Sequence, residues 1–266
     1  MRTISELSSL SGRVALITGA GGHIGSVIGD ALAELCADLI LLDREERQCR
    51  ESEARISGLW GVSTSSIIAD LEHIGDFNIV DEVMKIFGRL DILVNCAAFV
   101  GTDKLEGWNA PFAEQGVETW RRAVEVNLTA PFILSQALAP MLSESGHGSI
   151  INLSSIYGVC APDLSIYEGT DMHNPAAYAA SKAGLLQLTR WMSTVLAPRV
   201  RVNAITPGGV EREQPEGFIG RYAARTPMGR MAREEDIKGA AAYLASDLSG
   251  YVTGQNIVID GGWSVW

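Results

Sequence analysis

Short, nearly continuous apolar runs alternate with stretches of helical periodicity along most of this chain of 266 residues. Strands that are apolar along their whole length are typical of parallel sheets, because helices cover such sheets on both faces. Parallel neighbours need right-handed crossover connections, so the alternation predicts a single doubly wound α/β domain over residues 1–266. We expect a mainly parallel seven-stranded sheet, with strands over residues 14–18, 39–42, 66–69, 92–94, 149–153, 200–205 and 256–259.

Three stretches stand outside this alternation. Residues 1–11 precede the first strand and form an N-terminal extension. Residues 159–174 and 208–226 each follow a strand, and doubly wound folds bind ligands at the carboxyl ends of their strands. We therefore predict that these two stretches are loops on the substrate side of the sheet.

The charge balance excludes several classes of partner. With 32 acidic and 21 basic residues the formal net charge is −11, and the basic residues form no run. A nucleic acid or an anionic membrane surface needs clustered Lys or Arg, so neither is expected as a partner. No apolar run approaches the roughly 18 residues of a membrane span. The four cysteines form no C-x-x-C pair, which favours reduced thiols in a cytoplasm and predicts no metal site.

A glycine-rich loop joins the first predicted strand to the first predicted helix. Gly19, Gly21 or Gly22, and Gly25 let the backbone turn tightly and approach a pyrophosphate closely. The helix begins near His23, and its first N–H groups, at His23 and Ile24, would point at the negative oxygens. The alternative is a plain tight turn, but the position directly after a first strand favours a dinucleotide-binding (Rossmann) loop. We expect the His23 side chain itself to face solvent.

An acidic residue, Asp43, ends the second predicted strand. In dinucleotide-binding folds a carboxylate at this place accepts hydrogen bonds from the adenine ribose and repels a 2′-phosphate. The alternative for Asp43 is an ordinary helix N-cap, and the neighbouring Arg44 could instead receive a 2′-phosphate. We predict NAD in preference to NADP, with Asp70 and Leu71 beside the adenine.

Tyr178 and Lys182 stand four residues apart, a spacing that places two side chains on one face of a helix. A neighbouring ammonium favours phenolate and lowers the pKa of a tyrosine, as an acid/base group working near neutrality requires. Taken alone, the pattern is more typical of a surface pair.

Together these motifs resemble the short-chain dehydrogenase/reductase (SDR) family over nearly the whole chain. The matching segments are residues 18–25, 70–71, 95–98, 127, 152–155, 178–182, 207–208, 251–255 and 260–263. The resemblance implies a catalytic tetrad of Asn127, Ser155, Tyr178 and Lys182. In this family Tyr178 would exchange a proton with the substrate oxygen, which Ser155 holds. Lys182 would bind the nicotinamide ribose, and Asn127 would hold a water in a proton relay.

The same resemblance completes the expected cofactor site and the expected assembly. Tyr178 and Lys182 also belong to the cofactor site, as do Asn95, Ala97, Pro207, Gly208 and Val210. Such enzymes act on small-molecule substrates and are homotetramers or homodimers. Two alternatives concern single residues: Asn127 could cap a helix starting near Ala130, and Ser154 could replace Ser155.

The sequence departs from the family pattern at three places. Residues 95–98 read Asn-Cys-Ala-Ala instead of Asn-Asn-Ala-Gly, so the backbone beside the cofactor can be held differently. Arg212 stands where the family usually has threonine, and it could bind cofactor phosphates, bind an acidic substrate or face solvent. Ser155 and Tyr178 lie 23 positions apart, which is longer than the usual spacing.

The extra residues, 159–174, carry carboxylate, phenol and imidazole groups such as Asp163, Tyr167 and His173. Groups of this kind match the hydrogen bonds of a hydroxyl-rich ligand, whereas the alternative is a solvated or subunit-contact loop. Residues 154–170 are locally similar to dehydrogenases of flagellin glycosylation and nonulosonic-acid sugars. We predict hydride transfer between NAD(P) and a secondary alcohol or ketone of a sugar or polyol. The alternatives are a 3-oxoacyl-thioester reductase and a non-catalytic NAD-binding sensor or scaffold.

Overall fold

A seven-stranded sheet in the order β3-β2-β1-β4-β5-β6-β7 forms the centre of the computed structural model, which describes residues 1–99 and 105–266. All six ladders between these strands are parallel. The strands are β1 (Val14–Thr18), β2 (Asp38–Asp43), β3 (Thr64–Ile68), β4 (Ile92–Asn95), β5 (Gly148–Leu153), β6 (Val200–Pro207) and β7 (Asn256–Ile259). The predicted α/β class and strand set are confirmed. From β1 the chain adds β2 and β3 on one side of the sheet and then adds β4 to β7 on the other side. The switch point between β1 and β4 creates the crevice where such sheets bind ligands.

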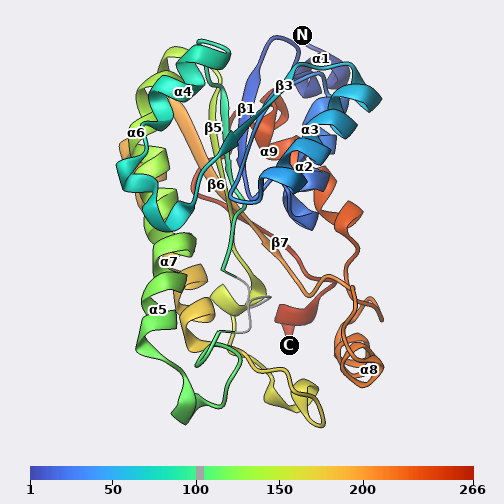
Figure 1. Ribbon diagram of the computed structural model, residues 1–266. Coiled ribbons are helices and arrows are strands. Elements are labelled where there is room, and N and C mark those ends of the chain that lie inside the picture. Colours follow the sequence, from blue (N-terminus) through green and yellow to red (C-terminus); the bar gives the residue numbers. More distant parts are fainter. Residues whose placement is uncertain (100–104) are drawn as a thin grey trace.

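Helices cover both faces of the sheet (Figure 1). One face carries α2 (His23–Glu34), α3 (Glu46–Trp60) and α9 (Lys238–Ala245). The other carries α4 (Ile79–Ile86), α5 (Val117–Val124), α6 (Ala130–Glu144) and α7 (Ala176–Val195). Short 3₁₀ segments are η1 (Leu71–Asp76), η2 (Phe112–Glu114), η4 (Ile156–Gly158), η5 (Leu164–Tyr167), η6 (Glu234–Ile237), η7 (Asp247–Ser249) and η8 (Trp263–Val265).

The alternation of side chains along each strand explains why the strands are apolar throughout. In β1, Leu16 packs into the core beneath α4, α6 and α7, whereas its neighbour Ile17 packs beneath α2, α3 and α9. Successive side chains of a strand point to opposite faces, so a strand covered on both sides needs apolar residues at every position. Both side chains are fully buried.

The helical run from α5 to α6 is continuous. The segment η3 (Glu125–Thr129) has π-type hydrogen bonding and joins the two helices without a break. Asn127 therefore lies inside a helix, and the alternative in which it caps a helix at Ala130 is wrong. Single π turns inside α-helices occur frequently at functional sites, because the extra residue displaces a backbone carbonyl from the regular ladder.

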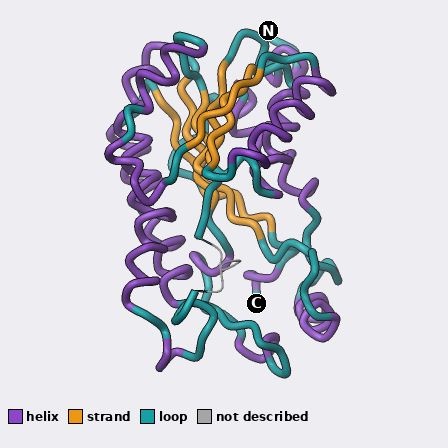
Figure 2. The backbone as a smooth tube through the Cα atoms, in the orientation of Figure 1, coloured by secondary structure: helices purple, strands orange, loops and turns teal. Residues whose placement is uncertain are grey.

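The three stretches outside the alternation are more ordered than the sequence suggested. Residues 1–11 include α1 (Ile4–Ser8), which ends beside the fully buried Leu10. The two expected loops each contain a helix, namely η5 and α8 (Glu216–Arg225). Both leave the carboxyl edge of the sheet, where most of the irregular backbone gathers (Figure 2). Within the described ranges, no helix combines the length and the apolarity that a membrane crossing requires.

Candidate active site

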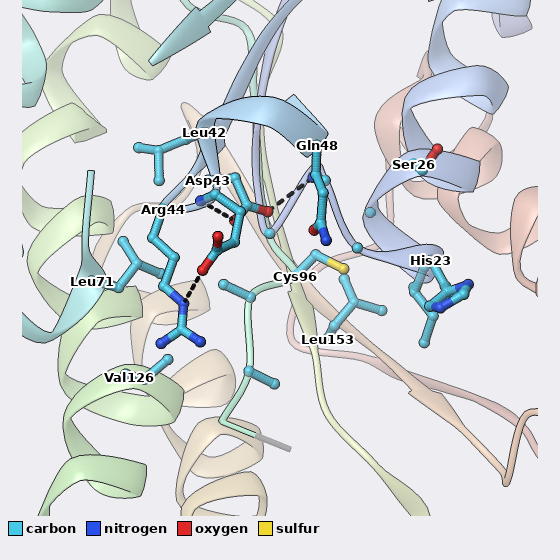
Figure 3. A pocket seen from close by; sticks show the side chains of 18 of the residues that line it. His23, Ser26, Leu42, Asp43, Arg44, Gln48, Leu71, Cys96, Val126 and Leu153 are labelled. Carbon is cyan, nitrogen blue, oxygen red and sulfur yellow. Dashed lines mark hydrogen bonds and ion pairs between the residues drawn. The ribbon is translucent and has the colours of Figure 1, made fainter. Parts of the chain in front are cut away.

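A cavity of about 1070 Å³ opens at the carboxyl ends of the strands (Figure 3). Asp43 and Arg44 lie toward one end of it, His23 lies toward the other, and the Cys96 thiol lies between them. Tyr178 and Lys182 of α7 also line this cavity. The fold thus brings the predicted cofactor loop and the predicted acid/base pair into one space, although they are far apart in the sequence.

The glycine loop is held by contacts that leave no room for side chains. Gly19 has a positive φ of 67°, and a Cβ on it would lie 2.7 Å from Cα of Ala97. A Cβ on Gly25 would overlap the carbonyl oxygen of Gly19, and one on Gly21 would lie 2.9 Å from Cβ of Gln48. The first turn of α2 therefore sits tightly against β1, with its N–H groups at the cavity. This bare backbone cradle fits the pyrophosphate of a dinucleotide.

The carboxylate of Asp43 is fixed at the end of β2. Its Oδ2 accepts a hydrogen bond of 2.9 Å from the N–H of Gly21, and its Oδ1 accepts one of 3.2 Å from the N–H of Glu45. Glu45, not Asp43, is the N-cap residue of α3. Arg44 lies beside it with Nε 3.4 Å from Oε1 of Glu45. Asp43 thus ties the glycine loop to the next helix while it faces the cavity.

Most of the residues predicted for the cofactor site line the cavity. These are Gly19, Gly21, Gly22, His23, Ile24, Gly25, Asp43, Arg44, Asp70, Leu71, Ala97, Tyr178, Lys182 and Pro207. Three predicted residues lie outside its wall. Asn95 is buried and donates to Oδ1 of Asn152 at 2.8 Å, Gly208 donates its N–H to the carbonyl of Ile259, and Val210 pairs with Ala232. These three residues therefore do not line the cavity in which we expected them to contact the cofactor.

Ser155 is buried and lies within hydrogen-bonding reach of the half-buried Tyr178. Ser155 follows β5 directly, and its Oγ also accepts from the N–H of Tyr157 at the start of η4. Gly158 ends η4 close to α7, because a Cβ there would lie 2.8 Å from the carbonyl carbon of Lys182. Ser154 is occupied elsewhere, since its Oγ donates to the carbonyl of Lys182 at 3.0 Å. This geometry supports Ser155 over Ser154 as the hydroxyl that faces Tyr178.

Lys182 is almost fully buried and donates from Nζ to the carbonyl of Leu153 at 2.7 Å. Burial lowers its pKa to about 8. Burial also raises the pKa of Tyr178, and the hydrogen bond from Ser155 opposes this only in part. The expectation of a lowered tyrosine pKa is therefore wrong for the chain by itself. The reason is that both groups are removed from water, which disfavours the charged form of each.

Asn127 connects α6 to the other elements of the site. Its Oδ1 accepts from the N–H of Phe99 at 2.7 Å, and its Nδ2 donates to Oγ of Ser181 at 3.1 Å. Ser181 in turn donates to the carbonyl of Tyr178 at 2.9 Å. The side chain is fully buried, and these two hydrogen bonds fix its position.

Several cavity residues have no counterpart in the motifs. Leu42, Gln48, Val126 and Glu234 line the space with the predicted set, as does Cys96 within the motif of residues 95–98. Removal from bulk water raises the pKa of the partly buried Cys96 thiol to about 12. Leu42 adjoins a motif residue in sequence, and that adjacency is a usable signal. Glu234 comes from a distant segment with no recognisable pattern, so only the fold reveals it.

The extra residues between Ser155 and Tyr178 pack as a compact unit beside the site. The phenol oxygens of Tyr157 and Tyr167 are 2.5 Å apart, and Tyr167 packs against Phe218 of α8 with ring centroids 5.4 Å apart. Arg221 of α8 donates from Nε to the carbonyl of Ile166 at 3.1 Å. The two stretches predicted as substrate-side loops thus support each other. In the described part of the chain, no group of three or more His, Cys, Asp or Glu side chains could hold a metal ion.

Comparisons with known proteins agree with this geometry. Residues 19–264 match the family model described as enoyl-(acyl carrier protein) reductase. The chain is 34% identical to galactitol 2-dehydrogenase (L-tagatose-forming) of Cereibacter sphaeroides, over 97% of each protein. It superposes with a TM-score of 0.86 on a short-chain type dehydrogenase/reductase from Mycobacterium marinum, at 30% identity and 99% coverage of both chains.

A further solved structure with bound ligands is equally similar. It is a gluconate 5-dehydrogenase from Burkholderia cenocepacia in complex with NADP and tartrate. The TM-score is 0.86 at 30% identity, with 99% of this chain and 100% of that chain covered. The protein described here belongs to the short-chain dehydrogenase/reductase family. It is an oxidoreductase that uses NAD or NADP and acts on CH–OH groups.

Proposed function

We propose that this enzyme interconverts a secondary alcohol and a ketone on a sugar, polyol or sugar-acid derivative, with Tyr178 as the acid/base. The observation that carries the proposal is that Ser155 lies within hydrogen-bonding reach of Tyr178, with Lys182 four residues further along α7. The bare glycine loop lies in the wall of the same cavity. A proton-transfer pair and a dinucleotide cradle in one space are the parts that hydride transfer requires.

The chain supplies position and proton transfer, whereas the bound nicotinamide supplies the hydride acceptor or donor. Ser155 holds the substrate oxygen by a hydrogen bond, next to the hydroxyl of Tyr178. In the oxidation direction Tyr178 accepts the alcohol proton as a phenolate, and in reduction it donates a proton to the ketone oxygen. The ammonium of Lys182 would bind the nicotinamide ribose, and its charge stabilises the phenolate. Asn127 fixes α6 and α7 around these groups.

The experiment that tests the role of Tyr178 is the variant Tyr178→Phe. Removing one hydroxyl from a buried ring leaves the packing intact, so NADH binding should survive within about twofold. Turnover should fall by about 10³-fold or more, because general acid–base catalysis of this kind contributes about 10²–10⁴. Steady-state rates and NADH titration measure the two effects separately. Turnover close to that of the unaltered enzyme would disprove the assignment.

We further propose that NAD is preferred over NADP. The support is the Asp43 carboxylate, which is fixed by two backbone N–H groups at the end of β2 and faces the cavity. A negative charge held at this place repels a 2′-phosphate and accepts from ribose hydroxyls. A similar structure holds NADP, so the preference depends on this one carboxylate against the neighbouring Arg44.

The substrate class is proposed from the unit formed by residues 156–172. The backbone N–H of Tyr157 donates to Ser155, and its phenol lies 2.5 Å from the phenol of Tyr167. A hydroxyl-rich substrate needs such polar partners when it is buried. Similar proteins are named as acting on galactitol and gluconate, which are polyhydroxylated compounds. The narrower similarity to flagellin-glycosylation dehydrogenases stays a prediction.

A 3-oxoacyl thioester is the second candidate substrate, because a protein of Thermotoga maritima that is 33% identical to this chain is named a 3-oxoacyl-[acyl-carrier-protein] reductase. A panel of polyols, sugar acids and 3-oxoacyl thioesters, followed at the nicotinamide absorbance band, separates the two. The third candidate, a non-catalytic cofactor sensor, requires that no member of the panel is turned over while NADH still binds.

We also propose a homotetramer or homodimer of single-domain subunits in a reducing cytoplasm. The outer faces of α5 and α7 carry Trp120, Trp191 and Val195, each of them exposed, and such apolar groups support a subunit contact. The four cysteines are all free thiols, with Cys36 exposed, which supports a reducing compartment. The first strand, β1, and the last strand, β7, belong to the same sheet, which supports a single domain. Sedimentation velocity measures the number of subunits.

A further inference from the structure

Arg212 and Glu234 form an ion pair in the wall of the cavity, with Nε 3.3 Å from Oε1. The same Oε1 lies 3.8 Å from Nδ1 of His23, the first residue of α2. One carboxylate oxygen is therefore placed between an arginine and the N-terminus of the helix that follows the glycine loop. In the described ranges, Glu234 is the only side chain to which the Arg212 guanidinium is bonded.

The backbone sets this pair in register. Val210 and Ala232 form a parallel bridge, secured by the N–H of Glu211 to the carbonyl of Ala232 and by the N–H of Ala232 to the carbonyl of Gly209. Arg212 and Glu234 each follow the bridge by two residues. In extended chains this spacing returns side chains to the same face. The N–H of Arg212 also donates to Oε1 of Gln214 at 2.6 Å, which fixes its backbone.

Another anion can replace the Glu234 carboxylate on the Arg212 guanidinium at little cost. Both side chains are about one-third exposed, and pairs of this kind contribute roughly 0–1 kcal/mol. The contact uses one nitrogen of a guanidinium whose planar fork can bind a phosphate through two. The N-terminus of α2 adds a partial positive charge and free N–H groups at the same place. An anion with two phosphates therefore competes well with a single carboxylate for this position.

We propose that Arg212 is a phosphate-binding residue of the cofactor site, and that Glu234 holds its guanidinium until the pyrophosphate replaces the carboxylate. The inference rests on the proposed function only in taking the ligand to be a nicotinamide dinucleotide. Glu234 has two consequences: it positions Arg212 in the free enzyme, and it competes with the entering anion. Removal of Arg212 therefore weakens the dinucleotide, and removal of the charge on Glu234 strengthens it.

The test is titration of each purified variant with NADH, ADP and adenosine in the absence of substrate, by calorimetry or by energy transfer from tryptophan to NADH. Arg212→Ala should raise the Kd of NADH and of ADP about tenfold and leave adenosine unchanged. Glu234→Gln should lower the Kd of NADH about two- to fivefold. Arg233→Ala and Glu235→Gln, which alter an exposed pair next to Glu234, serve as controls and should bind as the unaltered enzyme does.

Two results would overturn the assignment. One is an unchanged Kd for NADH and ADP in Arg212→Ala. If the KM for acidic substrates alone were raised in that variant, Arg212 would bind a substrate carboxylate instead. The other is weaker binding in Glu234→Gln, which would make Glu234 a support rather than a competitor. Failure of the proposed function is distinguishable, because an enzyme that binds NADH but oxidises no alcohol still gives these Kd values. An enzyme that binds neither NADH nor NADPH would overturn both.

Discussion

The two ends of the ligand region are built from different kinds of contact. At the cofactor end, backbone packs against backbone: Gly25 touches Gly19, and Gly19 touches Ala97. At the substrate end, side chains from three distant segments pack together, and they include Ile166, Phe218 and Trp263. The stacked rings of Tyr222 and Trp263, with centroids 4.2 Å apart, are typical of that end.

This difference determines which amino-acid substitutions each end tolerates. Backbone contacts cannot be relieved by a rotamer change, so a single added carbon forces the main chain to move. Aromatic side chains can lose one polar atom and keep most of their packing area. We therefore expect substitutions at the cofactor end to act on folding and dinucleotide binding together. Substitutions at the substrate end should separate substrate affinity from both.

The largest effect is expected for Gly25→Ala. The added Cβ would overlap the carbonyl oxygen of Gly19, which should cost about 1–3 kcal/mol of folding free energy. The Kd of NADH should rise about 100-fold, because the first turn of α2 must move away from β1. Gly58→Ala in α3 meets open space and should stabilise by roughly 0.5–1 kcal/mol. Thermal unfolding and NADH titration measure the two effects in both variants. Equal behaviour of Gly25→Ala and Gly58→Ala would show that the close backbone contacts of Gly25 are not what limits substitution at the cofactor end.

The next effect concerns the choice of cofactor. Asp43→Ala removes the fixed carboxylate at the end of β2 and should lower the ratio of kcat/KM for NAD to that for NADP at least about tenfold. Asp76→Ala, at an exposed site in η1, is the matched control. An unchanged ratio in Asp43→Ala would mean that the carboxylate serves only to tie Gly21 and Glu45 together.

A smaller effect is expected at the substrate end. Tyr167→Phe removes one phenol oxygen from the Tyr157 pair and keeps the contact with Phe218. We expect the KM for a polyol substrate to rise about fivefold, in line with a lost hydrogen bond of about 1 kcal/mol, while the Kd of NADH stays the same. Tyr251→Phe, at a fully exposed position, is the control. Equal losses of substrate and NADH binding would show that residues 159–174 serve folding rather than recognition.

The last effect concerns folding stability rather than ligand binding, and it lies between the two ends, at Lys182. Its folded-state pKa of about 8 is below the value of 10.5 expected when it is exposed. Below pH 8 both states hold the proton, and the folded state bears the full cost of a buried charge. Between pH 8 and 10.5 the unfolded state holds more protons, so stability rises with pH. Lys182→Met should therefore stabilise the cofactor-free protein by up to about 3 kcal/mol at neutral pH, and the difference should shrink above pH 8. Denaturant unfolding at several pH values measures it; a difference that does not change with pH would disprove it.

The sequence predicted the cofactor end better than the substrate end, for a physical reason. Gly19, Gly25 and Asp43 act within one strand–helix–strand unit, so their spacing alone reveals their contacts. The parallel seven-stranded sheet followed from the apolar strands and from right-handed crossovers, whereas the strand order comes from the structure. Residues 208–226 were predicted as a loop, whereas they contain α8, because its helix is stabilised by packing on Ile166 that no local pattern encodes.

The same distinction explains the individual misses at the site. The pKa of Tyr178 depends on how deeply α7 is buried, which a four-residue spacing does not reveal. The pairing of Arg212 with Glu234 depends on a bridge between Val210 and Ala232, and such long-range register is invisible in a single motif. Asn95 matched the family pattern, yet its amide bonds to Asn152 in the core because β4 and β5 are neighbours.

The contacts at the end of β5 determine where extra residues can be inserted into this enzyme. Three successive residues there each meet α7: Leu153 accepts from Lys182, Ser154 donates to its carbonyl, and Ser155 bonds to Tyr178. A residue inserted among them would disrupt the contacts that follow it, because it would turn every later side chain to the opposite side. Beyond Gly158 the chain is released from this register. Additional segments can therefore be grafted between residues 159 and 174 to remodel what enters the cavity, without disturbing the chemistry below it.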